Sequence, residues 1–343
     1  MIDSITVNEL AHLLNGTIVG NSNLVCTGVA SLGEAQKGDI TFMVSGKYAK
    51  QWENSKASIG IIQKDIQMPK NDNVERALLQ VEDADVAIAS VLGLFKTPIN
   101  KPQKGIHATA VIASSAMLGE GVAVGPNVVI EGNVILGDET VVCGGSHVGR
   151  DSKIGCRTML RPGVTIEHEC VIGDDCLLHA HVVIGTDGFG YRPNASKTGL
   201  TKMPHIGNVC IGNKVEIGAN SCIDRGKFSS TKIGNGTKMD NLVQIGHNVK
   251  IGDNCVIAAE CGIGGSVIIG DWVQIGAQVG IAPHCRVGNG AKVGAKSGLM
   301  HDVPPGEEWL GVPAARAKDT LRQWAINRKM PSLAKQFGVL KDD

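Results

Sequence analysis

One histidine and a pair of glycines in the second half of the chain have the residue types and the spacing of a proton-transfer site. Gly265 follows His247 by eighteen residues, and a second step of eighteen leads to Pro283, which precedes His284. An imidazole removes a proton from an attacking nucleophile, and a glycine N–H approaches a developing oxyanion closely because no side chain shields it. This chemistry requires a fold that brings positions eighteen residues apart together.

A six-residue period of aliphatic side chains supplies such a fold. Helices repeat near 3.6 residues and strands at two, so neither produces a strict six. The aliphatic positions are Ile106, Ile112, Leu118, Val124, Ile130, Leu136, Val142, Val148, Ile154, Leu160, Ile166, Ile172, Leu178, Ile184, Ile211, Ile217, Ile223, Ile233, Met239, Ile245, Ile251, Ile257, Ile263, Ile269, Ile275, Ile281, Val287, Val293 and Leu299. Each hexapeptide would form one side of a triangular coil with its aliphatic residue inside, which predicts a mainly β protein built on a parallel β-helix.

Three hexapeptides make one coil, so residues eighteen apart stack at the strand spacing. With strands about 4.8 Å apart, the repeats predict roughly nine or ten coils and a prism about 45 Å long. His247 and His284 then share one corner, two coils and roughly 9 to 10 Å apart. Only Gly264 and Gly265 stand between them. This predicts a space without side chains, bracketed by two imidazoles, in which Gly265 could serve an oxyanion.

Composition narrows the class of protein. Aromatic residues make up only 3% of the chain, which suits a solenoid interior filled by one aliphatic residue per side. The formal net charge is +0, so nothing global favours nucleic acid or an anionic membrane surface. No stretch is apolar and long enough to span a bilayer, and the first residues lack the regions of a signal peptide. We therefore expect a cytoplasmic protein.

The chain contains ten cysteines but no Cys-x-x-Cys motif. The cysteines that stand two residues before a periodic aliphatic are Cys170, Cys176, Cys255, Cys261 and Cys285. Small side chains are required at that position for packing, so we expect buried, reduced thiols that act as small apolar fillers.

Interruptions of the repeat predict the domain organisation. Residues 1–100 lack hexapeptides and predict a small α/β domain, residues 101–310 form the prism, and residues 311–343 form a helical tail. The elements expected in the first domain include a helix over Val7–Leu14, a strand over Ala57–Ile62 and a helix over Ala84–Phe95. Two further interruptions, Thr186–His205 and Asp224–Lys232, should leave the prism as loops.

Motifs along most of the chain resemble those of one family. They are Ile40-Thr41-Phe42-Met43 with Lys47-Tyr48, the loop Gly185–Tyr191, Glu216–Asn220, Ile223-Asp224-Arg225-Gly226 and Asp240–Asn248. The chain resembles the UDP-3-O-acylglucosamine N-acyltransferases of lipid A biosynthesis, which are left-handed parallel β-helices. The resemblance implies transfer of a 3-hydroxyacyl chain from acyl carrier protein to the 2-amine of UDP-3-O-(3-hydroxyacyl)glucosamine. It implies no cofactor of the protein itself, because 4′-phosphopantetheine arrives on the carrier.

The resemblance also assigns roles to residues. His247 matches the family's general base, and Asp240 matches the carboxylate that would fix its tautomer and stabilise the imidazolium. Phe42 and Tyr48 match a pair that sandwiches the uracil ring. Ser45 departs from the Asn-x-Lys-Tyr pattern common in the family, which leaves the polar contact to uracil open.

Three further residues are expected to bind substrate groups. Asn241 and Gln244 belong to the same stretch as His247 and could hold sugar or hydroxyacyl groups, and His284 could contact polar groups of the donor or the acceptor. A histidine that packs between subunits, a solvated turn aspartate at Asp240 and a core role for Phe42 are the simpler interpretations of the key residues.

The expected partners are the UDP-sugar, acyl carrier protein and further copies of the chain. Basic residues of the tail would help to dock an acidic carrier; they are Arg316, Lys318, Arg322, Arg328, Lys329 and Lys335. Hexapeptide prisms commonly associate in threes, so we expect a homotrimer in which two subunits wall each site.

Three other functions stay open at this point. Another β-helix sugar O-acyl- or N-acetyltransferase would differ in its donor, and a non-catalytic scaffold would not need His247. The γ-type carbonic anhydrases use this fold with zinc on three histidines, two of them five residues apart. No histidine lies five residues from His247 or His284 here, which makes zinc the weakest alternative.

Overall fold

The computed structural model describes residues 2–66 and 75–337, and the chain divides into two compact units, Met1–Asn100 and Lys101–Asp343. Residues 338–343, the end of the predicted tail, lie outside the described part. No helix in the described ranges is both long enough and apolar enough to cross a membrane.

In its described residues, the first unit contains a five-stranded sheet, a separate two-stranded sheet and three α-helices. Its elements in chain order are β1 (Ile5–Thr6), α1 (Val7–Leu13), β2 (Thr17–Gly20), β3 (Val25–Cys26), β4 (Gly28–Val29), β5 (Asp39–Met43), the 3₁₀ helix η1 (Gly46–Tyr48), α2 (Ala49–Asn54), β6 (Ile59–Gln63), β7 (Ala77–Val81) and α3 (Ala84–Phe95). The strand order is β2-β7-β6-β5-β4. The expected helices and strand are confirmed, and side-chain caps explain two helix starts: Thr6 caps α1 and Asp83 caps α3.

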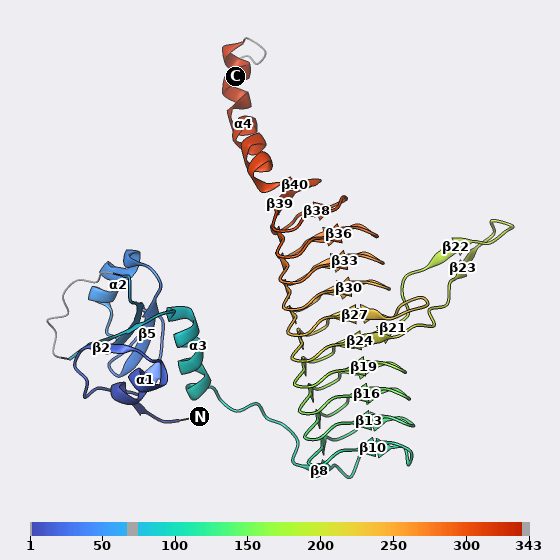
Figure 1. Ribbon diagram of the computed structural model, residues 1–343, viewed down its shortest axis with the longest axis horizontal. Coiled ribbons are helices and arrows are strands. Elements are labelled where there is room, and N and C mark those ends of the chain that lie inside the picture. Colours follow the sequence, from blue (N-terminus) through green and yellow to red (C-terminus); the bar gives the residue numbers. More distant parts are fainter. Residues whose placement is uncertain (1, 67–74, 338–343) are drawn as a thin grey trace. The chain divides into compact units, whose positions relative to one another are not determined.

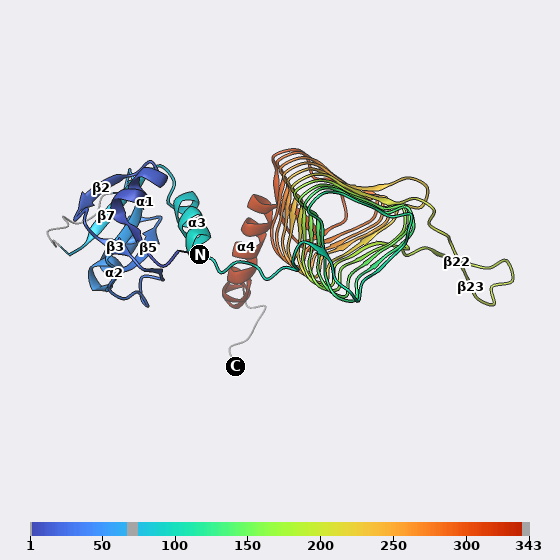
Figure 2. The same ribbon diagram turned by 90° about the horizontal axis from the view of Figure 1, so that it is seen from below.

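The second unit is the predicted β-helix. Three sheets of two- to four-residue strands wind around one apolar interior, and Figure 2 shows the triangular coils stacked on one another. In the ten-stranded sheet Ile245 pairs with Ile263, and Ile263 with Ile281, in steps of eighteen residues. These three side chains are at most 4% exposed. From Val124 to Leu299 the periodic aliphatic residues are at most 4% exposed and point inward as expected, whereas Ile106 in the first coil is 59% exposed.

The strands of each sheet are as follows. The nine-stranded sheet contains β10 (Met117–Leu118), β13 (Ile135–Leu136), β16 (Lys153–Ile154), β19 (Val171–Ile172), β24 (Val209–Ile211), β27 (Thr231–Ile233), β30 (Lys250–Ile251), β33 (Ile268–Ile269) and β36 (Arg286–Val287). The ten-stranded sheet contains β9 (Val111–Ile112), β12 (Val129–Ile130), β15 (His147–Val148), β18 (Thr165–Ile166), β21 (Val183–Thr186), β26 (Cys222–Asp224), β29 (Gln244–Ile245), β32 (Gly262–Ile263), β35 (Gly280–Ile281) and β38 (Gly298–Leu299). The twelve-stranded sheet contains β8 (Gly105–Ile106), β11 (Ala123–Val124), β14 (Val141–Val142), β17 (Met159–Leu160), β20 (Leu177–Leu178), β25 (Glu216–Ile217), β28 (Lys238–Met239), β31 (Val256–Ile257), β34 (Gln274–Ile275), β37 (Lys292–Val293), β39 (Glu308–Gly311) and β40 (Ala314–Arg316).

The cysteines before the periodic aliphatics are buried with free thiols, as expected. Cys255 shows what the position requires, because its Sγ lies 3.0 Å from the Gly270 carbonyl oxygen. One coil earlier, Thr237 makes the equivalent contact through its hydroxyl to Gly252 at 3.0 Å. Cysteine and threonine therefore fill this position in the same way, each with its polar tip near a backbone carbonyl of the next coil.

The insertion Thr186–His205 leaves the prism as a hairpin of β22 (Tyr191–Pro193) and β23 (Leu200–Lys202), which projects sideways in Figure 1. The buried Arg225 holds both ends of this insertion. Its Nε donates to the Gly185 carbonyl at 2.6 Å and its Nη1 to the Gly207 carbonyl at 3.1 Å. The sequence predicts that the tail begins at residue 311, but β40 still belongs to the twelve-stranded sheet, and the helix of the tail, α4 (Ala317–Gln336), begins only after it.

Candidate active site

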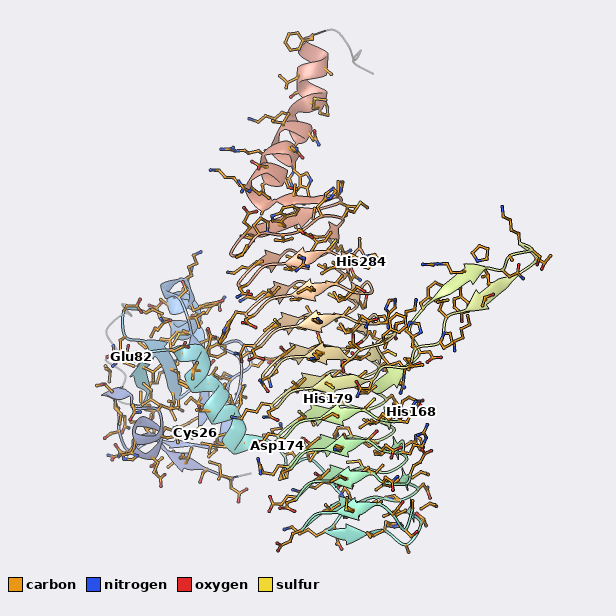
Figure 3. The ribbon with its side chains drawn as sticks, turned by 45° about the vertical axis from the view of Figure 1, so that its right-hand side comes forward. Cys26, Glu82, His168, Asp174, His179 and His284 are labelled. Atoms are coloured by element: carbon orange, nitrogen blue, oxygen red, sulfur yellow. The ribbon has the colours of Figure 1, made fainter. Side chains whose placement is uncertain are left out.

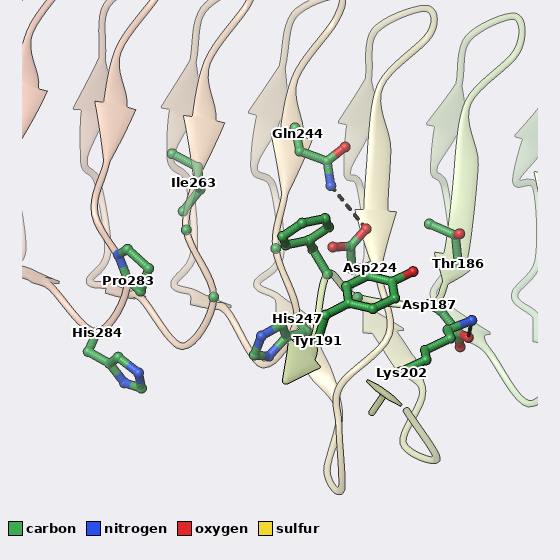
Figure 4. Close-up of a pocket in the computed structure, with 15 residues that line it drawn as sticks. Thr186, Asp187, Tyr191, Lys202, Asp224, Gln244, His247, Ile263, Pro283 and His284 are labelled. Atoms are coloured by element: carbon green, nitrogen blue, oxygen red, sulfur yellow. Dashed lines mark hydrogen bonds and ion pairs between the residues drawn. The ribbon is translucent and has the colours of Figure 1, made fainter. Parts of the chain in front are cut away.

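A pocket of about 730 Å³ lies where the hairpin insertion meets the corner that follows the ten-stranded sheet (Figure 4). Its lining residues are Thr186, Asp187, Gly188, Phe189, Tyr191, Lys202, Asp224, Gln244, Gly246, His247, Ile263, Gly264, Gly265, Pro283 and His284. Four residues predicted from the sequence, His247, Gly265, Gln244 and His284, thus line one pocket.

The His247 side chain lies over the next coil. A Cβ added at Gly265 would lie 2.7 Å from its Nε2 and 2.8 Å from its Cε1, so only glycine fits beneath the ring. Its Nδ1 lies 3.1 Å from the Oδ1 of Asn248. The amide oxygen is an acceptor, so it favours a hydrogen on Nδ1 and leaves Nε2 free to take a proton.

Gly265 presents its backbone amide beside that ring. Within residues 2–66 and 75–337, this N–H has no hydrogen-bond acceptor. Its carbonyl accepts from the N–H of His284 at 3.1 Å, which fixes the exposed His284 at the next coil (Figure 3). An unused backbone donor on the glycine beneath the imidazole is the kind of group that stabilises an oxyanion.

Asp224 is the carboxylate that shares this pocket with His247. It follows the periodic Ile223 and is 7% exposed, and its Oδ1 accepts from the Nε2 of Gln244 at 3.0 Å (Figure 4). Burial raises the pKa of Asp224 to about 6, while the Gln244 bond and the neighbouring His247 oppose that rise. Asp224 was not predicted as an active-site residue from the sequence. The signal that could have identified it is its place at the start of the second interruption of the repeat.

The hairpin insertion forms the wall of the pocket opposite the coils that carry His247 and His284. Asp187 forms an ion pair with Lys202, which lowers the pKa of the Asp187 carboxyl and ties the start of the insertion to β23. The rings of Phe189 and Tyr191 make an edge-to-face contact with centroids 5.3 Å apart. The predicted loop rings therefore lie at the pocket, where they offer apolar surface to a ligand.

Asp240 and Asn241 lie at a different corner of the same coil. Asp240 follows β28 of the twelve-stranded sheet, whereas His247 follows β29 of the ten-stranded sheet. Asp240 is exposed, and its Oδ1 accepts from the N–H of Asn241 at 2.7 Å and from its Nδ2 at 2.9 Å. Asn241 in turn accepts from the Ala219 N–H at 2.7 Å. Within one chain the expected contact of Asp240 with His247 does not form, because one side of the triangle separates them.

Phe42 and Tyr48 belong to the first unit. Phe42 lies in β5 and is 39% exposed, and Tyr48 ends η1 and is 38% exposed. Large aromatic rings are usually buried, so two exposed rings in one short segment are available to a ligand. The Ser45 hydroxyl accepts from the Lys47 N–H at 3.4 Å and so caps η1.

An apolar groove adjoins the pocket. It shares Gln244, Ile263 and Gly264 with the pocket and continues along the ten-stranded sheet to Leu299 and Met300. Its floor exists because the outward strand position is glycine in three successive coils, at Gly262, Gly280 and Gly298. The corresponding positions of the twelve-stranded sheet carry side chains such as Val256, Gln274 and Lys292.

Comparison with known proteins identifies the family. A model of UDP-3-O-(3-hydroxymyristoyl) glucosamine N-acyltransferase matches residues 23–94, and a model of bacterial transferase hexapeptides matches residues 151–186 and 230–265. UDP-3-O-acylglucosamine N-acyltransferase 1 of Francisella tularensis subsp. holarctica is 40% identical over 337 residues, 98% of this chain and 97% of the relative. The chain belongs to the UDP-3-O-acylglucosamine N-acyltransferase family.

Other members and structures agree with this assignment. The UDP-3-O-acylglucosamine N-acyltransferase of Polynucleobacter asymbioticus is 37% identical over 255 residues, 71% of each chain. The structure of Arabidopsis UDP-N-acetylglucosamine acyltransferase superposes with a TM-score of 0.57 at 27% identity, over 64% of this N-acyltransferase family member and 76% of the plant enzyme. The predicted left-handed parallel β-helix is therefore confirmed at the level of the fold class.

Proposed function

We propose that this protein transfers a 3-hydroxyacyl chain from acyl carrier protein to the 2-amine of UDP-3-O-(3-hydroxyacyl)glucosamine. The observation that carries the proposal is His247 held over the unused N–H of Gly265, in a pocket that continues into an apolar groove. Amide formation requires a base for the amine, a donor for the oxyanion and a surface for the acyl chain. All three lie on adjacent coils.

The reaction is direct transfer in a ternary complex. The amine nitrogen attacks the thioester carbonyl while Nε2 of His247 takes one of its protons, and the oxygen that becomes negative accepts from the Gly265 N–H. The tetrahedral intermediate then collapses, the C–S bond breaks, and the His247 imidazolium returns the proton to the departing sulfur. The products are the amide and the free thiol of the carrier.

Asp224 supports the charged stage of this cycle. The His247 imidazolium would be stabilised by a carboxylate in the same poorly solvated pocket. Gln244 anchors that carboxylate and borders the groove, so it also lies where the hydroxyacyl head would pass. His284 at the outer edge of the pocket is assigned to polar groups of the donor or acceptor.

The remaining parts of the substrates are assigned by chemistry. The acyl chain would occupy the groove over Gly262, Gly280 and Gly298, because its walls are apolar. Uracil would stack between Phe42 and Tyr48. The basic residues of α4 would orient the acidic carrier protein. We further propose a cytoplasmic homotrimer, in which a neighbouring copy helps to wall each pocket.

His247→Ala tests the proposal. We expect kcat to fall roughly 10²- to 10⁴-fold, with acceptor KM and the thermal midpoint nearly unchanged, because the base acts on the reacting atoms. His179→Ala is the matched control, since His179 bonds Glu216 at 2.9 Å outside the pocket. Near wild-type turnover of His247→Ala in a correctly assembled protein would contradict the mechanism and favour a scaffold role.

A substrate panel separates the proposed reaction from related ones. We expect transfer from hydroxyacyl carrier proteins to the amine of UDP-3-O-acylglucosamine. Transfer only from acetyl-CoA, or only to a hydroxyl of UDP-N-acetylglucosamine, would assign the protein to another class of sugar acyltransferase.

A further inference from the structure

A second histidine, His205, lies buried against the candidate base. It ends the hairpin insertion and is 6% exposed. Its ring centroid is 5.0 Å from that of His247, with the planes tilted by 56°. In the described part of the chain, both of its ring nitrogens are buried without a hydrogen-bond partner. Buried polar groups in native proteins are nearly always paired, so an unpaired histidine in contact with the candidate base is unusual.

His205 forms one wall of the slot that holds His247. A Cβ at Gly188 would lie 2.6 Å from the Cβ of His247 and 2.7 Å from the Nε2 of His205, so the loop backbone touches both residues. A Cβ at Gly190 would lie 3.1 Å from the Cε1 of His205. On its other side, His247 faces the backbone of Gly265. The His247 ring is thus enclosed between the inserted loop and the next coil.

The charge state of His205 matters because the two rings are so close. Burial and the neighbouring His247 lower the pKa of His205, and Lys227 acts in the same direction. Asp187 and the Met203 carbonyl favour the protonated form, but Met203 lacks hydrogen-bonding geometry toward the ring. A neutral His205 leaves His247 as the group that becomes charged, whereas a cationic His205 would repel the imidazolium formed during transfer.

We propose that His205 is a positioning residue for the acyl-transfer reaction: as a buried, uncharged ring it holds the His247 imidazole with Nε2 over Gly265. This inference rests on the proposed function, because it assigns His205 to the base of that reaction. His205 touches neither substrate nor the reacting atoms and acts only through His247.

Two substitutions at His205 separate the effect of a flat ring packed against His247 from the effect of a side chain that can be protonated. His205→Ala removes the wall, and we expect kcat to fall about 10- to 50-fold with both KM values within about twofold of wild type. His205→Phe keeps a flat ring that cannot be protonated, and we expect it to retain kcat within about threefold. His179→Ala again serves as the control. A wild-type kcat in His205→Ala, or a rise in KM without a fall in kcat, would overturn the proposal.

Histidine ¹⁵N NMR on the full-length protein supplies a readout that does not depend on turnover. We expect His205 to titrate below an ordinary histidine and to titrate higher in His247→Ala, which removes the neighbouring ring. We also expect the His247 ring of the wild type to occupy one tautomer, and of His205→Ala to average between two. A protonated His205 at pH 7, or an unchanged His247 ring in His205→Ala, would contradict the inference.

The two experiments together separate this inference from the proposed function. If no variant or wild-type protein transfers an acyl group, the proposed function fails while the NMR result still decides whether His205 positions His247. If His205→Ala does not fold, as judged by its thermal midpoint, His205→Leu preserves volume without the flat ring. We then expect its kcat to fall by at least tenfold, and retention of wild-type kcat would overturn the proposal.

Discussion

At the residue scale, the groups of the candidate active site are ordinary side chains whose surroundings give them unusual properties. His247 is constrained by a glycine beneath its ring and by an asparagine at its Nδ1. Asp224 is buried beside it with one oxygen bonded to Gln244. Burying a carboxylate costs free energy whenever it is ionised, so the proposed role of Asp224 conflicts with the stability of the fold.

Asp224→Asn should therefore stabilise the protein at neutral pH and impair it as an enzyme. The folded-state pKa of Asp224 is raised from 3.8 to about 6, so the folded protein binds more protons than the unfolded chain between those values. Stability consequently falls as pH rises through this window. The raised pKa lowers the free energy of unfolding by about 2 to 3 kcal/mol at pH 7. The asparagine side chain of the Asp224→Asn variant has no charge and would avoid this loss.

Thermal midpoints at pH 7.5 and pH 5 measure this effect. The excess of the Asp224→Asn midpoint over that of wild type should be larger at pH 7.5, and kcat should fall. Asp240→Asn, at an exposed carboxylate, is the control and should shift the midpoint little at either pH. An equal shift for Asp224→Asn at both pH values would show that burial of the charge is not the cause.

Tyr48→Ala should raise the KM for the UDP-sugar without changing kcat or the affinity for the carrier. Stacking on one base contributes about 1 to 3 kcal/mol, which corresponds to roughly 5- to 150-fold in KM. Val44→Ala is a suitable control because Val44 is 39% exposed in the same segment but carries no ring. Steady-state kinetics with the acceptor varied provides the measurement, and an unchanged KM would remove the uracil assignment.

At the scale of elements, the groove exists because three successive strands carry no side chain at their outward position. The outward positions of β32, β35 and β38 are glycines, and a Cβ added at Gly280 would have nothing within 4 Å. The same strands carry buried isoleucine or leucine residues at their inward positions, so the core is fully packed although the outward positions have no side chain. A substitution there changes the groove without disturbing the fold.

Gly280→Leu should shorten the preferred acyl chain. Leucine would fill the middle of the groove, so we expect kcat/KM for long-chain hydroxyacyl carriers to fall about 10- to 100-fold, while four-carbon donors lose less than threefold. Gln274→Leu introduces the same side chain at the corresponding position of the twelve-stranded sheet. It should leave kcat/KM unchanged for both long-chain and four-carbon donors. Equal losses for long and short donors would argue against an acyl groove at this sheet.

At the scale of the whole molecule, the prism presents apolar surface that a partner would cover. Trp272 is 66% exposed and Leu242 is 53% exposed, each at a corner of the coils. The proposed association of three copies would cover side chains of this kind, which makes them positions at which the assembly can be tested. Association in threes would also place a second wall beside each open pocket.

Sedimentation equilibrium should accordingly give three times the chain mass of 35.9 kDa. Trp272→Glu should weaken the assembly and lower activity together, because burying an unpaired carboxylate at an interface is costly. Trp272→Phe should preserve both. A fully active monomer would contradict the proposal that two copies form each site.

The sequence by itself determined the β-helix and the corner where His247 meets Gly265. A strict six-residue period fixes which side chain points inward, and steps of eighteen fix which residues stack, since both follow from local geometry repeated along the chain. The same counting separates Asp240 from His247, because one side of the triangle contains six residues and these two positions follow different sides. The regular six-residue register therefore predicts the separation of Asp240 and His247 better than the motif in which both residues occur.

The tertiary structure alone decided the burial of Asp224 and the position of His205. Both belong to interruptions of the repeat, where no period relates a residue to its neighbours in space. The return path of the hairpin depends on long-range contacts, above all those of Arg225 with Gly185 and Gly207. These contacts place His205, at the end of the insertion, against His247 of the prism. Local sequence patterns cannot predict that these two residues lie close together.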